Sequence, residues 1–418
     1  MPFSYSYSSR TVILESYPIR DNKRFMVFSR PFPAQTMVPC LSALTILAGA
    51  ALLSTYGVRR MIRLAILDHP GHRSSHSRAT PKGGGIGIMG AFLVCWPLMH
   101  WVTGGTGPHG LGIMTGAATV LLCIVSWLDD LHQWPPSAKL ATQCAAASMI
   151  AGGFALSCGL PALTPESLAQ QGAVQDGFSW PVPQWPALIH ALRGWLVPVV
   201  GFVASVLWLV FVTNAVNFMD GLNGLVSGCL LVAALVLAAF APALGAAELV
   251  WPALLLACCL AGFLPYNFPH ARIFMGDVGS QGCGLLAGTA SLYLMLHTPS
   301  RVEGGWLFGP AVLAPLLYDV LFTLVRRQRA GLPLAQAHRG HLYQVLHRSG
   351  LATPSISFAE WGMTLWGGAA IAAMICLMPV VGGLYAALAC GVLIIVPQVL
   401  WTGFTLHRTK AHPVGAWS

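Results

Sequence analysis

The stretch "NAVNFMDGLNGL", Asn214 to Leu225, decides the fold, because it follows an apolar run long enough to cross a membrane. That run, "WLVPVVGFVASVLWLVFV", covers residues 195–212, and Thr213 joins it to the polar stretch. A helix end needs one capping residue, whereas this stretch holds an aspartate, three asparagines and two glycines. Other long apolar runs in the chain are also followed by polar clusters, which indicates several membrane-spanning helices with functional residues at their ends.

The composition supports a membrane protein. Of the 418 residues, 56% are hydrophobic and only 8% are charged, and the mean hydropathy is +0.68. Soluble domains carry about 25% charged residues, so a water-soluble enzyme of this size is excluded. The apolar runs are continuous rather than alternating, which excludes a β-barrel. None of the eleven cysteines forms a CxxC pair, and most lie inside apolar runs, so we expect neither a disulfide framework nor a zinc site.

Runs of about 20 apolar residues are typical of transmembrane helices. We therefore predict an all-α polytopic membrane protein with about eleven spans in a single domain over 37–410, and an outer-face loop over 159–195. The predicted spans are 38–57, 84–103, 110–128, 139–158, 196–214, 225–244, 249–266, 280–297, 306–325, 358–379 and 384–406.

The distribution of positive charge predicts the orientation. Connectors after odd-numbered spans hold 15 of the 22 Lys and Arg residues, whereas connectors after even-numbered spans hold only Arg193 and Arg301. Since positive charge is retained inside, we expect the odd-numbered spans and the C-terminus to end in the cytoplasm. Five cations in the tail 1–36 conflict with this topology. A start at Met26 or Met37 would largely or wholly remove the conflict, so we interpret this tail as dispensable or artefactual.

Five polar clusters each lie in a connector that follows an odd-numbered span. All five are therefore predicted to lie on the cytoplasmic face. They lie in loops that we place at 59–83, 129–139, 215–224, 266–279 and 326–357. Independent solvated loop ends would be scattered over both faces. Their concentration on one face therefore predicts a single site that is assembled from several helix ends.

The residue types in these clusters suit an anionic ligand and a metal. Mg²⁺ is bound by one or two carboxylates together with substrate phosphates. Lys82 to Gly85, "KGGG", opens a span and should leave backbone N–H groups free for phosphate. Each cluster taken alone is more often a solvated helix end or a flexible turn, so the inference depends on their joint pattern. The candidate carboxylates are Asp129, Asp130, Asp220 and Asp277. The candidate hydrogen-bond donors to phosphate oxygens are His338, Arg339 and His341.

One further acid, Asp319, lies inside the span 306–325. An ionisable residue at that depth is unusual. We expect it to have a structural role, in which it pairs either with Arg326 or with a neighbouring helix.

The motifs resemble those of a known family. "DHPGHRSSHSRATPKGGG", "LDD" followed by "KLATQ", "NAVNFMDGLNGL", "ARIFMGDVGS" and "HRGHLYQ" occur in that order. They resemble the polyprenyl-phosphate N-acetylhexosamine-1-phosphate transferases of glycosyltransferase family 4, which are relatives of the phospho-MurNAc-pentapeptide transferases. The form "RSSHSRATPKGGG" is most similar to the branch that starts O-antigen or other surface polysaccharides.

The resemblance implies an enzyme of the bacterial inner membrane with its active site on the cytoplasmic face. It implies a UDP-activated N-acetylhexosamine as donor, undecaprenyl phosphate as acceptor, Mg²⁺ or alternatively Mn²⁺ as cofactor, and often a homodimer. The expected products are UMP and undecaprenyl-diphosphate-sugar. No nucleic-acid partner is expected.

Roles carry over where residues match the family's motifs. Asp129 and Asp130 match an aspartate pair, and Asp277 matches a metal-binding aspartate. Asp220, with Asn217, matches an Asn-x-x-Asp-Gly motif, and we expect it to be the second metal ligand.

Asn267 and Phe274 fall where relatives hold the uracil ring, and Lys139 matches a lysine near the phosphates. His338 and His341 match a histidine-rich loop. To these we add Arg73, Lys82, Arg272 and Arg339 as cations for the substrate phosphates.

One departure from the family concerns Asn223, because many relatives have a second aspartate there. Asparagine keeps an oxygen ligand but loses the charge, which puts an acidic role at this position in doubt.

Alternatives remain at this stage. Cell-wall synthesis as a phospho-MurNAc-pentapeptide transferase is disfavoured by the "RSSH" and "HRGHLYQ" forms, and a membrane transporter is disfavoured because transporters bind substrate near the midplane. The sequence leaves open which N-acetyl sugar is used. It also leaves open whether Asp129 or Asp130 removes a proton or orients the metal or the acceptor.

Overall fold

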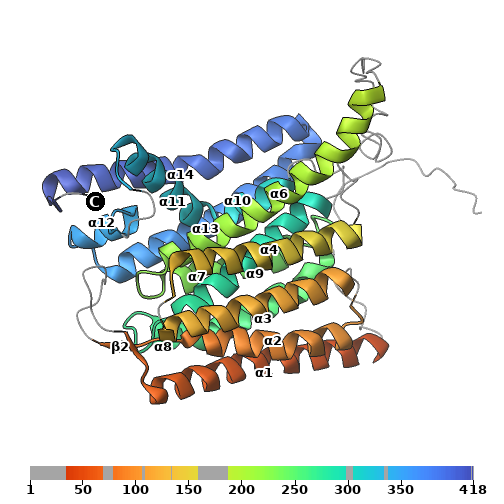
Figure 1. The fold of residues 1–418 in the computed structure, drawn as a ribbon, viewed down its shortest axis with the longest axis horizontal. Helices are drawn as coiled ribbons and strands as arrows, with labels where there is room; N and C mark the ends of the chain where they lie inside the picture. Colours follow the sequence, from red (N-terminus) through yellow and green to blue (C-terminus); the bar gives the residue numbers. More distant parts are fainter. Residues whose placement is uncertain are drawn as a thin grey trace, which may run out of the picture.

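The protein is a bundle of long helices (Figure 1). The computed structural model describes residues 34–68, 79–105, 109–132, 134–158, 187–297, 305–333, 338–415 and 417. Residues 159–186 of the predicted outer loop and most of the predicted N-terminal tail lie outside these residues, and so does Arg73. The rest of that predicted loop, residues 187–195, is helical.

α-Helices make up most of the described chain. In chain order they are α1 (Ala34–Leu64), α2 (Gly84–Val102), α3 (His109–His132), α4 (Pro136–Cys158), α6 (Ala187–Met219), α7 (Leu225–Phe240), α8 (Val250–Asn267), α9 (Gly276–His297), α10 (Phe308–Val312), α11 (Ala314–Arg329), α12 (Leu342–Arg348), α13 (Thr353–Val381) and α14 (Gly383–Ala411). Two 3₁₀ turns, η3 (Ala247–Leu249) and η4 (Gly305–Leu307), precede α8 and α10. A two-residue antiparallel pair joins β1 (Leu67–Asp68) to β2 (Thr80–Pro81).

The prediction of an all-α polytopic membrane protein is confirmed. Within the described residues, seven helices are long and apolar enough to cross a membrane, and α7 is a shorter apolar helix. The remaining predicted spans coincide with α4, α9 and α10–α11, which are helical but are not among those seven.

The predicted span 306–325 is not one continuous helix. It is divided into η4, α10 and α11, with a break at Leu313. Pro315 lies in the first turn of α11. Proline favours a helix start because it has no N–H to donate and its φ suits the first turn.

Several helices extend further into the predicted polar loops than expected. Helix α3 continues to His132 and α6 to Met219, and α9 begins already at Gly276. Asp130, Asn217 and Asp277 therefore lie on the terminal turns of helices, where the bundle fixes their backbone positions.

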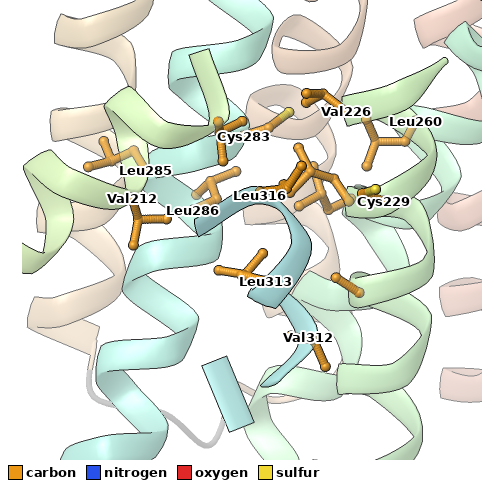
Figure 2. Close-up of a cluster of buried hydrophobic side chains, with 14 of the residues drawn as sticks. Val212, Val226, Cys229, Leu260, Cys283, Leu285, Leu286, Val312, Leu313 and Leu316 are labelled. Atoms are coloured by element: carbon orange, nitrogen blue, oxygen red, sulfur yellow. The ribbon is translucent and has the colours of Figure 1, made fainter. Parts of the chain in front are cut away.

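The middle of the bundle is closely packed. Figure 2 shows apolar side chains of α6, α7, α8, α9 and the α10–α11 segment meeting in one cluster, including Val212, Cys229, Leu260 and Leu313. In a membrane, helices associate through such packing and through small residues that let backbones approach. One close approach joins α2 to α9, because a Cβ on Gly85 would lie 2.1 Å from the Gly279 nitrogen.

The polar ends of the helices gather at one end of the bundle. In Figure 1 this end is on the left, with β2, α12 and the C-terminal end of α14. Contacts between distant segments join these ends, among them Lys82 to Asp130, Lys139 to Asp277 and Asn217 to Asp277. The predicted convergence of separate helix ends is therefore present in the fold.

Candidate active site

Asp277 lies at the centre of the polar end. Gly276, with a φ of 73°, precedes it and places it in the first turn of α9, where the helix dipole favours a negative charge. Asn217 Nδ2 donates to Asp277 Oδ1 at 3.1 Å. Lys139 Nζ and Gln281 Nε2 donate to Oδ2 at 3.0 and 3.1 Å. These three donors, from α6, α4 and α9, fix the orientation of the carboxylate.

Lys139 joins two of the predicted acids. Besides its bond to Asp277, it forms an ion pair with Asp129 Oδ2. Asp129 is 4% exposed, and its Oδ1 accepts the Trp134 N–H at 2.8 Å. Both oxygens of Asp129 therefore already have partners. The lysine also offsets the unfavourable position of this acid at the C-terminus of α3.

Only one side-chain oxygen of Asp130 has a hydrogen-bond partner among the described residues. Lys82 Nζ donates to its Oδ1 at 3.0 Å and to its backbone carbonyl at 2.9 Å. Its Oδ2 is buried and, among the described residues, has no hydrogen-bond partner. A Cβ on Gly276 would lie 3.3 Å from that oxygen, so Oδ2 lies beside the start of α9. A buried carboxylate oxygen without a partner is costly, and it is a candidate ligand for a cation.

Asp220 follows α6 and belongs to the same group. Burial, and then the charges of Asp277 and Asp130, raise the pKa of Asp220 to about 7. No described residue donates a hydrogen bond to its side chain. A carboxyl group close to two other carboxylates requires either a proton or a cation.

The carboxylates fit the predicted Mg²⁺. Asp220 and Asp130 Oδ2 are free to bind, and Asp277 Oδ1, which accepts one hydrogen bond from Asn217, keeps a second lone pair. Hard oxygen donors of this kind suit Mg²⁺ or Mn²⁺. The described residues contain no ready group of three His, Cys, Asp or Glu side chains in metal-binding positions. A cation bound here would therefore need further ligands, which substrate phosphates can supply.

The prediction that "KGGG" leaves free N–H groups is wrong for two of its glycines. Gly84 N donates to the Phe274 carbonyl at 2.9 Å, and Gly85 N donates to the Met275 carbonyl at 2.8 Å. A Cβ on Gly84 would lie 2.3 Å from the Phe263 ring. These glycines are required because α2 packs backbone to backbone against the segment before α9. Lys82, from the same motif, holds Asp130.

Asn267 has a structural role in this geometry. Its side chain is 4% exposed, accepts the Gly224 N–H at 2.7 Å and donates to the Ile273 carbonyl at 3.0 Å. It thereby ties the turn after Asp220 to the segment before Asp277, and this role does not favour the predicted contact with a nucleobase. Phe274 is half-buried beside it, and its backbone pairs with Pro81 and Gly84.

Asn223 also holds this turn. Its Nδ2 donates to the Pro269 carbonyl at 3.2 Å, and its own carbonyl accepts from Ser357 Oγ at 2.9 Å. A carboxylate at this position could not donate, so the asparagine fits the local structure of this chain.

The histidine loop adjoins the turn that carries Asp220. Tyr343 Oη donates to the Phe218 carbonyl at 3.0 Å. A Cβ on Gly221 would lie 2.2 Å from Tyr343 Oη. Burial, and then the nearby His341 and arginine charges, lower the pKa of His338 to about 4, so this ring is neutral at pH 7. Its Nδ1 accepts the Gly340 N–H at 3.2 Å, which leaves Nε2 as the donor.

His341 and Asp319 form a buried pair that fixes this loop. His341 Nδ1 lies 3.1 Å from Asp319 Oδ1, and both side chains are almost completely buried. Asp319 also accepts the Leu342 and Tyr343 N–H groups at 2.9 and 3.1 Å, at the start of α12. The structural role expected for Asp319 is therefore present, with the histidine loop as its partner and not Arg326.

The predicted cations differ in their surroundings. Arg272 is exposed and lies beside Tyr266, and no described contact joins it to the carboxylates. Arg339 is half-buried next to His338 and has no described ionic partner.

A buried chain of side-chain amides supports Asp277, and the sequence analysis did not identify it. Gln281 Oε1 accepts from Gln143 Nε2 at 3.1 Å, and Gln143 exchanges two hydrogen bonds with Asn214. Lys139 and Gln143 are four residues apart on α4, as are Asp277 and Gln281 on α9. This spacing places both pairs on one helix face, so it could have revealed the chain.

Comparisons with known proteins agree with the motifs. Residues 112–295 match the profile of glycosyl transferase family 4. The chain is 31% identical over 297 residues to the phospho-N-acetylmuramoyl-pentapeptide-transferase of Moorella thermoacetica, covering 69% of this chain and 83% of that protein. It is 29% identical to the decaprenyl-phosphate N-acetylglucosaminephosphotransferase of Mycolicibacterium smegmatis, covering 69% and 70% of the two chains.

A third relative is the probable undecaprenyl-phosphate N-acetylglucosaminyl 1-phosphate transferase of Bacillus subtilis. It is 27% identical over 320 residues, or 76% of this chain and 80% of that protein. On the profile match, the coverage of these relatives and the shared motifs, the chain belongs to glycosyl transferase family 4.

Proposed function

We propose that the protein transfers an N-acetylhexosamine 1-phosphate from a UDP-sugar to undecaprenyl phosphate. The observation that carries this proposal is the gathering of Asp130, Asp220 and Asp277 at one end of a membrane bundle. A lipid phosphate stays at the membrane boundary and a nucleotide sugar stays in water, so their reaction requires a site at that boundary. The names of the relatives describe the same class of reaction.

The reaction balances without a covalent enzyme intermediate. An oxygen of the acceptor phosphate attacks the β-phosphorus of the UDP-sugar, the bond to the bridging oxygen breaks, and UMP leaves. Catalysis of phosphoryl transfer depends mainly on positioning and charge stabilisation. When bound by Asp277, Asp220 and Asp130, Mg²⁺ would neutralise part of the negative charge that the two substrates bring together.

The surrounding side chains would orient the substrates. Lys139 is already paired with Asp129 and Asp277, so it holds these acids in position and adds positive charge. His338 Nε2 and the Arg339 guanidinium are available as donors to phosphate oxygens.

A general base is not required. The second pKa of a phosphate monoester is about 6, so the acceptor is already mostly a dianion at neutral pH. Asp129 has its carboxylate engaged by Lys139 and Trp134, which supports an orienting role over proton removal. If Asp129→Asn regained activity at high pH, proton removal would be favoured instead.

We further propose that the site faces the cytoplasm at the inner membrane, as the cation distribution indicates, and that the product starts an O-antigen or another surface polysaccharide. The relative from Moorella thermoacetica favours a second candidate, transfer of phospho-MurNAc-pentapeptide.

The test combines membranes, Mg²⁺ and undecaprenyl phosphate with UDP-GlcNAc, UDP-GalNAc, UDP-QuiNAc, UDP-FucNAc or UDP-MurNAc-pentapeptide, and measures UMP and lipid product. UMP release with one N-acetylhexosamine donor would support the proposal. Product from UDP-MurNAc-pentapeptide alone would support the second candidate. No UMP with any donor would contradict both.

A further inference from the structure

Two arginines from separate segments meet at one tyrosine at the polar end of the bundle. Arg59 lies near the C-terminus of α1, Tyr266 near that of α8, and Arg272 in the connector before α9. Arg59 Nε donates to the Tyr266 hydroxyl at 2.6 Å. The guanidinium carbons of Arg59 and Arg272 lie 5.7 and 5.9 Å from the centre of the Tyr266 ring.

Among the residues that the structure describes, neither arginine of this Arg59–Tyr266–Arg272 cluster has an acidic partner. Within the described part of the chain, the ion pairs between acidic and basic side chains involve Lys82, Lys139 and His341, and none involves either arginine. Each guanidinium lies within about 6 Å of the same ring, so the two charges are no more than about 12 Å apart and repel each other. Cation–π contact accounts for the attraction of each arginine to the ring, but it does not neutralise the pair.

The cluster lies beside a surface suited to lipid. Helix α1 forms one edge of the bundle (Figure 1). Leu52 and Tyr56 on α1 are 71% and 61% exposed. Arg60 and Arg63, also exposed, continue the same face of the helix toward its polar end. An apolar face that ends in several guanidinium groups is the arrangement expected at a membrane boundary.

We propose that the Arg59–Tyr266–Arg272 cluster binds a phosphate group carried by a lipid of the adjacent leaflet. Guanidinium groups bind phosphate oxygens in a forked geometry, and two of them can share one anion. Two lipid classes carry this chemistry: an anionic phospholipid, and polyprenyl phosphate. Only the second rests on the proposed function, in which case the cluster receives the acceptor outside the carboxylate site.

The test uses the whole protein in nanodiscs of phosphatidylcholine with a minor share of phosphatidylglycerol. Lipids retained by the released protein are measured by native mass spectrometry for the wild type and the double variant Arg59→Gln/Arg272→Gln. The matched control, Arg329→Gln/Lys410→Gln, removes two exposed cations elsewhere on the chain. We expect the first double variant to retain roughly tenfold less phosphatidylglycerol, and the control to match the wild type. Equal retention by both double variants would overturn the proposal.

Three further measurements complete the design. Arg272→Gln alone changes an exposed connector residue and should lose part of the retention even if the double variant fails to fold. Full retention by that single variant, together with a misfolded double variant, would count against the proposal.

Added polyprenyl phosphate that displaces phosphatidylglycerol would identify the acceptor as the preferred ligand, and failure to displace it would identify the phospholipid. Displacement by equimolar inorganic phosphate would overturn the requirement for a lipid. Because binding is measured without the UDP-sugar, a negative result here is distinguishable from failure of the proposed reaction.

Discussion

At the residue scale, the acids divide into two groups by their hydrogen bonds. Asp129 and Asp277 are engaged by donors on both oxygens, whereas Asp220 and one oxygen of Asp130 are free. The first group is held in position by the protein, with one lone pair left on Asp277 Oδ1, and the second has most of its binding capacity left for a cation. This division could not be read from the sequence, in which all of these residues are simply acids at helix ends.

The amide of Gln281 provides a test of this division. Gln281→Leu removes one donor to Asp277 Oδ2 and breaks the chain of amides to Gln143. Loss of a residue that hydrogen-bonds to a metal ligand typically lowers metal affinity about 10- to 100-fold. We therefore expect Mn²⁺ affinity, measured by electron paramagnetic resonance, to weaken at least about tenfold. Gln398→Leu replaces a buried glutamine of α14 and serves as the control. Equal Mn²⁺ affinity in the two variants would contradict a role for Gln281 in orienting Asp277.

Asp220 predicts a pH dependence of stability. Its pKa is raised from 3.8 to about 7 in the folded protein. Between these values the folded state binds more protons than the unfolded state, so stability falls as pH rises. Without metal, we expect the melting temperature in detergent to decrease from pH 5 to pH 8, and Mg²⁺ to reverse the decrease.

In Asp220→Asn, which cannot ionise, the decrease should be much smaller. A wild-type melting temperature that rises over this range, or an unchanged slope in the variant, would show that Asp220 does not have the raised pKa described above.

Individual residues also mark what the sequence could not reveal. The positions of the motifs along the chain correctly predict that the aspartates are neighbours. Each aspartate lies where a helix begins or ends at the same end of the bundle. It gave no information about side-chain hydrogen bonds. The sequence therefore does not reveal that Asn267 and two glycines of "KGGG", which it predicts as ligand contacts, hold backbone segments together.

At the element scale, the site depends on how closely α2 approaches α9. Gly84 and Gly85 donate backbone hydrogen bonds to the segment before Asp277, and Gly85 touches Gly279. A displacement of α2 would move Lys82 away from Asp130 and would shift the start of α9. The predicted helix was correct, but the sequence did not show which face of it would carry the contact.

Gly85→Ala tests this contact. The added Cβ would lie 2.1 Å from the Gly279 nitrogen, so the two helices must separate. We expect a clear fall in melting temperature and at least about tenfold lower UMP release, since a small misplacement of catalytic groups is costly.

Gly90→Ala on the same helix meets no atom within 4 Å, and it should be neutral or slightly stabilising. If the two variants behaved alike, the close contact between α2 and α9 would be unnecessary.

At the scale of the whole molecule, alternating spans bring distant segments to one end. Four residues that are far apart in sequence meet at this end: Lys82, Lys139, Asn217 and Asp277. Each lies where a helix begins or ends at the same end of the bundle. Hydropathy and motif order predict this much. They do not predict the break between α10 and α11 or the buried pair Asp319–His341, because these arise from packing between helices.

The proposed reaction requires Asp130, Asp220 and Asp277 to hold one cation between separate helix ends. The most direct measurement is a Mn²⁺ titration by electron paramagnetic resonance, with UDP-N-acetylglucosamine present, of the wild type and of Asp130→Asn, Asp220→Asn and Asp277→Asn. Glu248→Gln, in η3 at the opposite end of the bundle, is the control. We expect one Mn²⁺ site that each of the three substitutions weakens at least about tenfold and that the control leaves unchanged. Unchanged Mn²⁺ affinity in any two of the three variants would contradict it.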